Sequence, residues 1–295
     1  MDKKGLLSIH IAVFLFGASG LFVKLIPMSV FLITLSRALF SALALYMFVH
    51  YRHLSLRLNR LRDYFWNILA GIFLTIHWIF YILSIQVSTV YIGTIIYATY
   101  PMFVFIIEPY AFKEKFQMKN LLCILLIGIG IAFLIPAFEL NNSTTLGIIY
   151  GLISSFSFAI LSVINRRLAF HYDSAVITMY EQAVVAIIMT LLISVTNISL
   201  GEGTMIHFIE LLIYALVFTA LGHSLYINGL ANIKAQTASV ISVLEPVYSV
   251  FLAMIFLNER LSYQDMIGTI VIFLAVIIAT LKKGDNNEEI PSTNT

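Results

Sequence analysis

Long apolar runs joined by short polar connections make up nearly the whole chain. A membrane-spanning helix needs about 20 apolar residues. Ten runs reach this length, at about residues 6–25, 28–50, 65–86, 89–111, 119–138, 145–166, 174–196, 207–229, 234–256 and 263–281. The runs are continuous and do not alternate every second residue, which favours helices and excludes a membrane barrel. The pattern predicts an all-α membrane protein with ten transmembrane helices.

Composition supports a membrane location. The chain is 60% hydrophobic and 11% charged, with a mean hydropathy of +0.97, which a soluble surface does not tolerate. The net charge of +2 gives no support for nucleic-acid binding. The single cysteine, Cys123, allows no internal disulfide and no metal cluster. No cofactor motif occurs, and the polar tail 284–295 is expected to be disordered.

The basic residues indicate the orientation. If the amino terminus starts in the cytoplasm and the chain crosses ten times, the outside receives only Lys24 and Arg260, and Arg37 lies within a span. All other lysines and arginines are then cytoplasmic, as the positive-inside rule requires. Lys3 and Lys4 precede a run of span length, so we expect a retained first helix and not a cleaved signal peptide. Both termini are predicted to be cytoplasmic, in the plasma (inner) membrane.

The two halves of the chain resemble each other. An offset of 145 residues relates Pro101 to Pro246, Tyr81 to Tyr226 and Glu114 to Glu259. Residues 1–140 hold spans 1–5 and residues 141–283 hold spans 6–10. Because five is odd, the second half must enter the membrane from the opposite side, which makes the repeat an inverted one. A 5+5 inverted repeat with interrupted helices is typical of transporters.

The two matched prolines mark spans 4 and 9. Proline has no N–H, so Pro101 and Pro246 free the carbonyls of Tyr97 and Ser242, four residues earlier. A freed carbonyl inside the membrane must meet water, a side chain or a ligand. The alternatives are a packed kink satisfied by a neighbouring helix and a functional break. The symmetric placement favours the functional break.

Ionisable side chains inside spans are costly and usually face a cavity or one another. Glu245 could bind an amine-bearing solute or carry a proton, or it could stay neutral and bond to a neighbour. Arg37 and Glu181 lie near equivalent positions, which predicts a structural ion pair, although Arg37 could instead bind a substrate carboxylate. His77 and His223 could be packing residues or part of a cavity. At the ends of spans, we expect Glu108 to be interfacial, and Glu114 and Glu259 to bond backbone or basic groups.

Aromatic and small residues complete the candidate site. Small residues around Gly17 and Ser157 allow helices to approach closely, and an organic solute would be bound among aromatic side chains with a few polar groups. The predicted substrate cavity contains Phe16, Gly17, His77, Trp78, Tyr81, Tyr97, Pro101, Ser157, His223, Tyr226, Ser242, Glu245 and Pro246.

A family resemblance adds to these observations. The segments from Tyr97 through Pro101 to Lys115, and from Ser242 through Pro246 to Arg260, resemble the paired motif of EamA-type carriers of the drug/metabolite transporter superfamily. Phe16, Gly17 and Arg37 are similar too. The resemblance implies secondary transport, often export, of amino acids or other small metabolites through a central cavity, with spans 5 and 10 peripheral. The first half departs from the second in one respect, because Tyr100 stands where Glu245 does.

Other classes have weaker support. Gly17-Ala-Ser-Gly20 matches the short pattern of intramembrane serine proteases, but close helix packing explains it. The aspartates lie in loops, tails or span ends, and a phosphate-binding loop is absent from the sequence, which argues against an aspartyl protease and against direct ATP coupling. A channel would need more pore-lining charge. We expect an exporter of small organic metabolites working by alternating access, with the lipid bilayer and a small-molecule substrate as partners and the proton as a candidate coupling ion.

Overall fold

The computed structural model describes residues 3–114, 118–134, 142–196, 204–242 and 244–280; the tail expected to be disordered lies outside them. The regular structure within these residues is helical. In chain order the helices are α1 (Lys3–Leu25), α2 (Val30–Tyr51), α3 (Leu61–Val87), α4 (Val90–Tyr97), α5 (Tyr100–Phe112), α6 (Met118–Leu134), α7 (Ser143–Ala169), α8 (Ser174–Thr196), α9 (Met205–Ile213), the π-helix η1 (Tyr214–Leu221), α10 (Gly222–Leu230), α11 (Ala235–Ile241), α12 (Leu244–Phe256) and α13 (Tyr263–Thr280).

Within the described residues, eight helical segments are long and apolar enough to cross a membrane. Three of them combine consecutive helices: α4 with α5, α9 with η1 and α10, and α11 with α12. Several begin at a side chain that accepts a hydrogen bond from the first helical turn, as Ser29 does at α2, Thr89 at α4 and Asn142 at α7. The chain is therefore an integral membrane protein built of helices.

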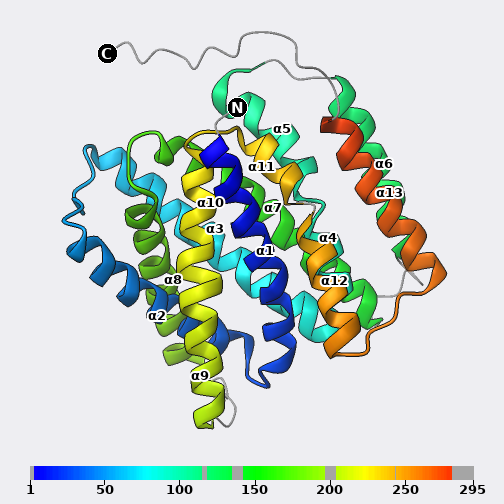
Figure 1. The fold of residues 1–295 in the computed structure, drawn as a ribbon, viewed down its shortest axis with the longest axis horizontal. Coiled ribbons are helices and arrows are strands. Elements are labelled where there is room, and N and C mark those ends of the chain that lie inside the picture. Colours follow the sequence, from blue (N-terminus) through cyan, green and yellow to red (C-terminus); the bar gives the residue numbers. More distant parts are fainter. Residues whose placement is uncertain (1–2, 115–117, 135–141, 197–203, 243, 281–295) are drawn as a thin grey trace.

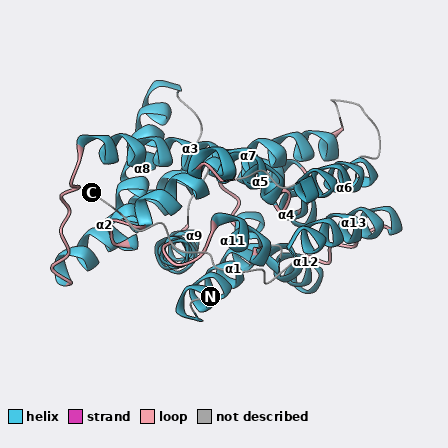
Figure 2. Cartoon of the chain, turned by 90° about the horizontal axis from the view of Figure 1, so that it is seen from above, coloured by secondary structure: helices cyan, strands magenta, loops and turns pink. Residues whose placement is uncertain are grey.

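The two remaining apolar helices, α6 and α13, pack against each other at one edge of the bundle, apart from most other helices (Figures 1 and 2). They contain 17 and 18 described residues. Their apolar stretches are shorter than those of the eight long segments. The peripheral position expected for the fifth and tenth predicted spans agrees with this arrangement.

Both prolines interrupt their helices where the sequence predicts a break. Tyr97 ends α4 and Tyr100 begins α5, which has Pro101 in its first turn. Ile241 ends α11 and Leu244 begins α12, which has Pro246 in its first turn. The freed carbonyl of Tyr97 accepts a hydrogen bond from Ser155 Oγ of α7 at 3.0 Å. The carbonyl of Ser242 accepts from the N–H of Glu245 at 2.9 Å. Protein groups therefore satisfy both carbonyls in this conformation.

The two broken segments run antiparallel and each caps the start of the other. Glu108, near the end of α5, accepts hydrogen bonds from the first two N–H groups of α11. Glu259, just after α12, accepts from the N–H groups of Val90 and Tyr91 at the start of α4. Figure 1 shows the same relation, because α4 and α12 lie at the lower end of the bundle and α5 and α11 at the upper end.

The helix contacts repeat when the halves are exchanged. α3 packs against α7 as α10 packs against α1, and α7 packs against α4 and α5 as α1 packs against α12. α2 packs against α8, and α6 packs against α13. The last helical turn of α13 lies at the same end of the bundle as the start of α1 (Figure 1).

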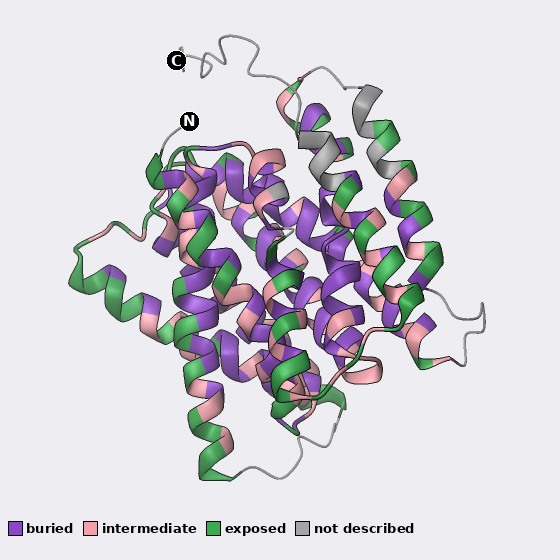
Figure 3. Cartoon of the chain, turned by 45° about the vertical axis from the view of Figure 1, so that its right-hand side comes forward, coloured by how far each residue is buried: buried purple, intermediate pink, exposed green. Residues whose placement is uncertain are grey.

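Buried residues concentrate along the middle of the bundle and exposed residues on its outside (Figure 3). The core joins α1, α3, α7 and α10 and contains large buried residues such as Tyr100, Tyr214 and Tyr226. Large apolar side chains such as Phe14, Phe65 and Leu191 are exposed on the outside. In a membrane protein this outer surface faces lipid, so it needs no protein partner.

Candidate substrate cavity

A small cavity lies in the middle of the bundle, between helices of both halves of the chain. It has a volume of about 30 Å³, enough for roughly two water molecules. The lining side chains are largely buried from the molecular surface. They are Phe16, Ser19, Arg37, His77, Trp78, Tyr81, Tyr97, Phe158, Phe218, Thr219, His223 and Glu245.

Arg37 supplies a buried positive charge to the cavity wall. Its Nε donates to Thr219 Oγ1 at 3.0 Å and its Nη1 donates to Tyr214 Oη at 2.9 Å. The guanidinium also lies 3.7 Å above the ring of Trp78 and 4.4 Å above that of Tyr214, which stabilises a cation. Among the described residues, no carboxylate lies within ion-pair distance of Arg37.

Glu245 brings a carboxyl group to the same cavity from the first turn of α12. The residue is 2% exposed, and its Oε2 has no hydrogen-bond partner among the residues that the structure describes. The hydroxyl of Tyr81, another lining residue, is also buried without a partner. Buried polar atoms of this kind are expensive unless something bonds to them, so this wall is suited to a polar ligand.

The buried pair that we expected between Arg37 and Glu181 is replaced by different contacts. Glu181 Oε2 lies 2.8 Å from His223 Nε2, while Arg37 is held by the hydroxyls of Tyr214 and Thr219. The π-helix η1 explains the change, because it carries both hydroxyls toward Arg37. The other buried histidine, His77, contacts Ser154 Oγ through Nδ1 at 2.7 Å.

Aromatic rings close the cavity on the side of α5. Tyr97 stacks on Tyr100 with ring centres 5.3 Å apart, and Phe158 packs edge-on against Tyr100 at 5.0 Å. The hydroxyl of Tyr226 lies 3.3 Å from that of Tyr100 and 3.0 Å from Ser162 Oγ. Tyr226 therefore belongs to this layer and is not among the residues that line the cavity.

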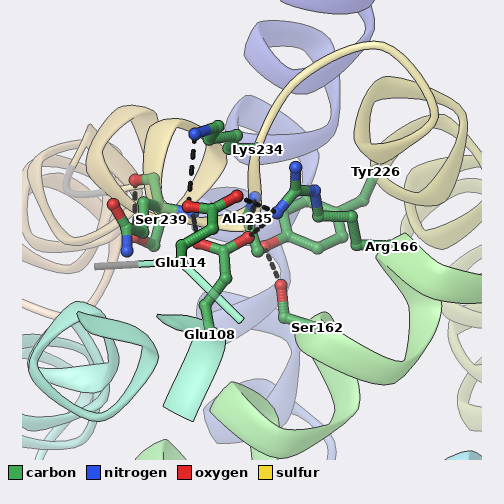
Figure 4. Close-up of polar contacts among 9 residues, drawn as sticks. Glu108, Glu114, Ser162, Arg166, Tyr226, Lys234, Ala235 and Ser239 are labelled. Atoms are coloured by element: carbon green, nitrogen blue, oxygen red, sulfur yellow. Dashed lines mark hydrogen bonds and ion pairs between the residues drawn. The ribbon is translucent and has the colours of Figure 1, made fainter. Parts of the chain in front are cut away.

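Beyond the aromatic layer lies a cluster of charged side chains, Glu108, Glu114, Arg166 and Lys234, which we call the ionic cluster (Figure 4). Arg166 Nη1 contacts Glu108 Oε1 at 2.6 Å and Glu114 Oε1 at 3.8 Å. Lys234 Nζ donates to Glu114 Oε2 at 3.2 Å. Both acids belong to the first half and both bases to the second, so the cluster joins the halves where α1 begins.

Glu108, which we expected near the membrane interface at the end of its span, is enclosed by protein. Its side chain is 0% exposed. The position is favourable because Glu108 accepts two backbone N–H groups and the Arg166 charge, which together offset the cost of burial. Glu114 contacts basic groups and Glu259 contacts backbone, as predicted.

At the opposite end of the cavity the closure is aromatic. Phe22, near the end of α1, packs on Phe218 with ring centres 4.8 Å apart and stacks parallel to Tyr214 at 6.3 Å. Phe218 itself lines the cavity. Aromatic rings alone therefore close this end of the cavity, whereas the aromatic layer and the ionic cluster together close the other end.

The remaining predicted site residues have structural contacts. Gly17 lets α1 approach α12, because an added Cβ would lie 2.7 Å from Tyr248 Cβ and 2.8 Å from the carbonyl oxygen of Glu245. The hydroxyls of Ser157 and Ser242 bond to carbonyls in their own helices. Pro101 and Pro246 are buried in the first turns of α5 and α12.

The cavity also contains residues that we did not place there. Ser19, Phe158, Phe218 and Thr219 line it, and Arg37 does so without an acidic partner. One sequence signal was available for Thr219, which lies one helical turn before His223 and so on the same helix face. No group of three or more potential metal ligands occurs among the described residues.

Comparisons with known proteins agree with this architecture. The model of the EamA-like transporter family matches residues 3–135 and 145–281. An uncharacterized inner membrane transporter, YicL of Salmonella typhimurium, is 25% identical to this chain. The alignment covers 95% of this chain and 96% of YicL. An uncharacterized transporter of Bacillus subtilis, YxxF, is 20% identical over 75% of this chain and 71% of its own length.

A solved crystal structure shares the fold. It superposes with a TM-score of 0.74 over 95% of this chain and 98% of the other, at 15% identity. The family match extends over most of the chain and includes both broken helices and the residues that line the cavity. The chain belongs to the EamA-like transporter family.

Proposed function

We propose that this transporter is a secondary carrier that exports small organic metabolites such as amino acids by alternating access. It would do so from the plasma (inner) membrane, with both termini in the cytoplasm. The observation that carries the proposal is the central cavity between the two halves. Among the described residues, its Arg37 has no carboxylate partner and its Glu245 has no basic partner. The exporter direction rests on the family resemblance.

Ten spans in an inverted 5+5 repeat are part of the proposal. α6 and α13 supply the fifth and tenth spans, because 17 and 18 residues at 1.5 Å per residue give about 26 and 27 Å. A hydrocarbon core is about 30 Å thick, and helices of this length fit with slight local thinning. The reciprocal capping by Glu108 and Glu259 supports the inversion, because it requires the two broken segments to run in opposite directions.

The charges in the cavity favour a solute with both an acidic and a basic group. Arg37 can bind a carboxylate in addition to its hydroxyl partners, and Glu245 can bind an amine. The surrounding rings of Trp78, Tyr97 and Phe158 suit an apolar or aromatic side chain. Such a solute is an amino acid or a close relative, and its two charges would each gain a counter-charge in a region that lacks bulk water.

Transport requires the cavity to enlarge and to open at one end at a time. Its volume of about 30 Å³ is well below the roughly 300–1,000 Å³ of typical ligand sites. The ionic cluster closes the end where α1 begins, and the Phe22–Phe218 contact closes the other. In the proposed cycle the halves rock about the breaks at Pro101 and Pro246, which separates one closure while the other stays shut.

Flux in proteoliposomes tests the function directly. Purified protein is reconstituted and supplied with a library of amino acids and related metabolites, with and without a pH gradient. Saturable flux with counterflow of a preloaded solute identifies a carrier, non-saturating flux identifies a channel, and cleavage of a solute without flux identifies an enzyme. Either of the last two results would end the proposal.

Glu245→Gln tests the role of the carboxyl group in the cavity. The variant keeps the shape of the side chain but loses its charge, so flux of an amine-bearing solute should fall by roughly 10- to 100-fold, the cost of one charged hydrogen bond. Glu210→Gln on α9, which does not line the cavity, is the matched control. Equal flux in the wild type and Glu245→Gln would remove Glu245 from the binding site.

Cysteine labelling tests the inversion. Single cysteines at Lys113 and Asn258, in a background with Cys123→Ser, are exposed to a membrane-impermeant maleimide in cells and in inverted vesicles. We expect the cysteine at 113 to react from the cytoplasmic side and the cysteine at 258 from the outside. Labelling of both from the same side would refute the 5+5 arrangement.

A further inference from the structure

The pair formed by Glu181 and His223 is not needed to bind the proposed solute. Glu181 lies in the middle of α8 and His223 is the second residue of α10, and both side chains are buried, with 0% and 3% exposure. Their Oε2 and Nε2 atoms lie 2.8 Å apart. In the described part of the chain, the second carboxyl oxygen of Glu181 has no hydrogen-bond partner, and neither do the amide atoms of the following Gln182.

Within the part of the chain that the structure describes, this pair makes no ion pair with a lysine or arginine. Arg37 of α2, which lines the same cavity as His223, is bonded to Tyr214 and Thr219 of η1. The other titratable side chains that line the cavity are His77 and Tyr81 of α3, Tyr97 of α4 and Glu245 of α12. Tyr214 of η1 lies behind this wall, bonded to Arg37. Within the described residues, α1 and α7 contribute to the cavity only Phe16, Ser19 and Phe158.

A neutral imidazole beside an ionised carboxylate would leave one negative charge buried in the membrane. Such a charge is costly unless a cation compensates it. One added proton removes the problem, because the pair then carries no net charge, whether the proton is on nitrogen or on oxygen. Histidine is also the side chain whose charge changes most readily between pH 5 and 8. The pair therefore has the composition of a site for a single proton.

The local backbone supports a functional role for this position. The π-helix η1 ends at Leu221, and His223 lies two residues after this end. Within η1, Thr219 Oγ1 donates to the carbonyl of Tyr214 five residues earlier. π-Helical segments are rare and occur frequently at functional sites. Here the segment turns Tyr214 and Thr219 toward Arg37, while His223 just after it reaches both Glu181 and the cavity.

We propose that Glu181 and His223 together bind the proton that couples solute movement to the pH gradient. The inference rests on the proposed function for the coupling, although proton binding itself does not. The step moves one proton from water onto the pair and later back to water, and no other bond forms or breaks. Because His223 faces the cavity and Glu181 does not line it, proton occupancy alters the cavity wall without occupying the solute position.

The first experiment measures coupling in proteoliposomes. A pH gradient of one unit can support about tenfold accumulation if one proton moves per solute. We expect Glu181→Gln to lose this gradient-driven accumulation while keeping solute counterflow without a gradient within about twofold of the wild type. Glu210→Gln serves as the control for the loss of a carboxylate elsewhere. Accumulation that does not respond to pH in the wild type, or that responds equally in Glu181→Gln, would overturn the proposal.

The second experiment counts protons and does not depend on transport. Purified protein in nanodiscs is shifted between pH 8 and pH 5, and an indicator dye reports the protons taken up. We expect Glu181→Gln and His223→Gln each to take up about one proton fewer than the wild type. His10→Gln, at an exposed position of α1, controls for the loss of a histidine outside the pair. The decisive comparison is between double variants.

The double variant distinguishes a shared site from two separate ones. If Glu181 and His223 bind one proton together, Glu181→Gln/His223→Gln should match either single variant, whereas Glu181→Gln/His10→Gln should lose the sum of its two single losses. Additive losses in the first double variant, or an uptake by Glu181→Gln equal to that of the wild type, would overturn the site. If no solute moves in the wild type, the proposed function fails, and this proton count still decides whether the pair binds a proton.

Discussion

The ionic cluster should hold the cavity closed at the end where α1 begins, and removing Arg166 should open it. Arg166→Met keeps an apolar side chain against Phe112, whose ring lies 4.3 Å from the guanidinium. The change leaves the buried carboxylate of Glu108 without its charged partner at 2.6 Å. The perturbation therefore acts on the charge and only slightly on packing.

The magnitude follows from the contacts. Breaking a buried pair by removing one partner costs about 3–5 kcal/mol. Glu108 keeps two backbone N–H donors from α11, so we take the low end, about 3 kcal/mol. If the closed state alone contains the pair, this cost shifts the equilibrium between closed and open states by roughly 100-fold.

The assay measures access to a buried residue near the cluster. Ser239 on α11 is 0% exposed, and its hydroxyl donates to the carbonyl of Gln236 in its own helix. A Ser239→Cys reporter in a Cys123→Ser background is labelled with maleimide in nanodiscs. We expect Arg166→Met to raise the labelling rate by at least about tenfold, whereas Glu259→Gln, at the opposite end, leaves it unchanged.

A double variant separates electrostatics from general loosening. Adding Glu108→Gln to Arg166→Met removes the orphaned charge, so part of the increase in labelling should be reversed. The reasoning would be refuted by an unchanged rate in Arg166→Met. It would equally be refuted if the double variant were labelled as fast as the summed effects of Arg166→Met alone and Glu108→Gln alone imply.

Three further predictions concern the broken helices and their packing. The double variant Pro101→Ala/Pro246→Ala should slow transport several-fold, because continuous helices resist rocking. Its free energy of unfolding should stay within about 1 kcal/mol of that of the wild type. Wild-type flux in this variant would contradict the role of the prolines. Ser155→Ala removes the hydroxyl that bonds the freed carbonyl of Tyr97 and should lower the free energy of unfolding by about 1–2 kcal/mol, measured by denaturation in detergent; no change would contradict it. Gly17→Ala should destabilise the protein by about 1–3 kcal/mol in the same assay, and Gly128→Ala, where an added Cβ meets nothing within 4 Å, is the matched control; equal stabilities of the two variants would argue against close packing at Gly17.

Much of the fold was predictable because membrane helices leave a strong local signal. A span must be long and apolar, and its backbone must bond within itself, so the eight long segments and both proline breaks could be read from residue order. The sequence also predicts which neighbouring residues share one face of a helix. His77, Trp78 and Tyr81 share a helix face, and all three line the cavity.

The partners of the charged residues could not be predicted in the same way. Arg37 and Glu181 occupy matching positions, but the π-helix shifts the facing residues of the eighth predicted span and brings Tyr214 and Thr219 to Arg37. Glu108 looked interfacial from its distance to the end of the helix. Only the docking of α11 reveals two N–H groups and a guanidinium that make its burial favourable.

The order of the residues alone determined that this chain is helical, lies in a membrane, is duplicated and is interrupted at two equivalent prolines. These properties depend on hydrophobicity, on periodicity and on the missing N–H of proline, all of which act over a few neighbouring residues. Tertiary structure decided which buried charges meet, which end of the cavity is closed by ion pairs, and that Glu181 faces His223. These contacts join residues 42 to 58 positions apart along the chain, so they depend on how whole helices dock.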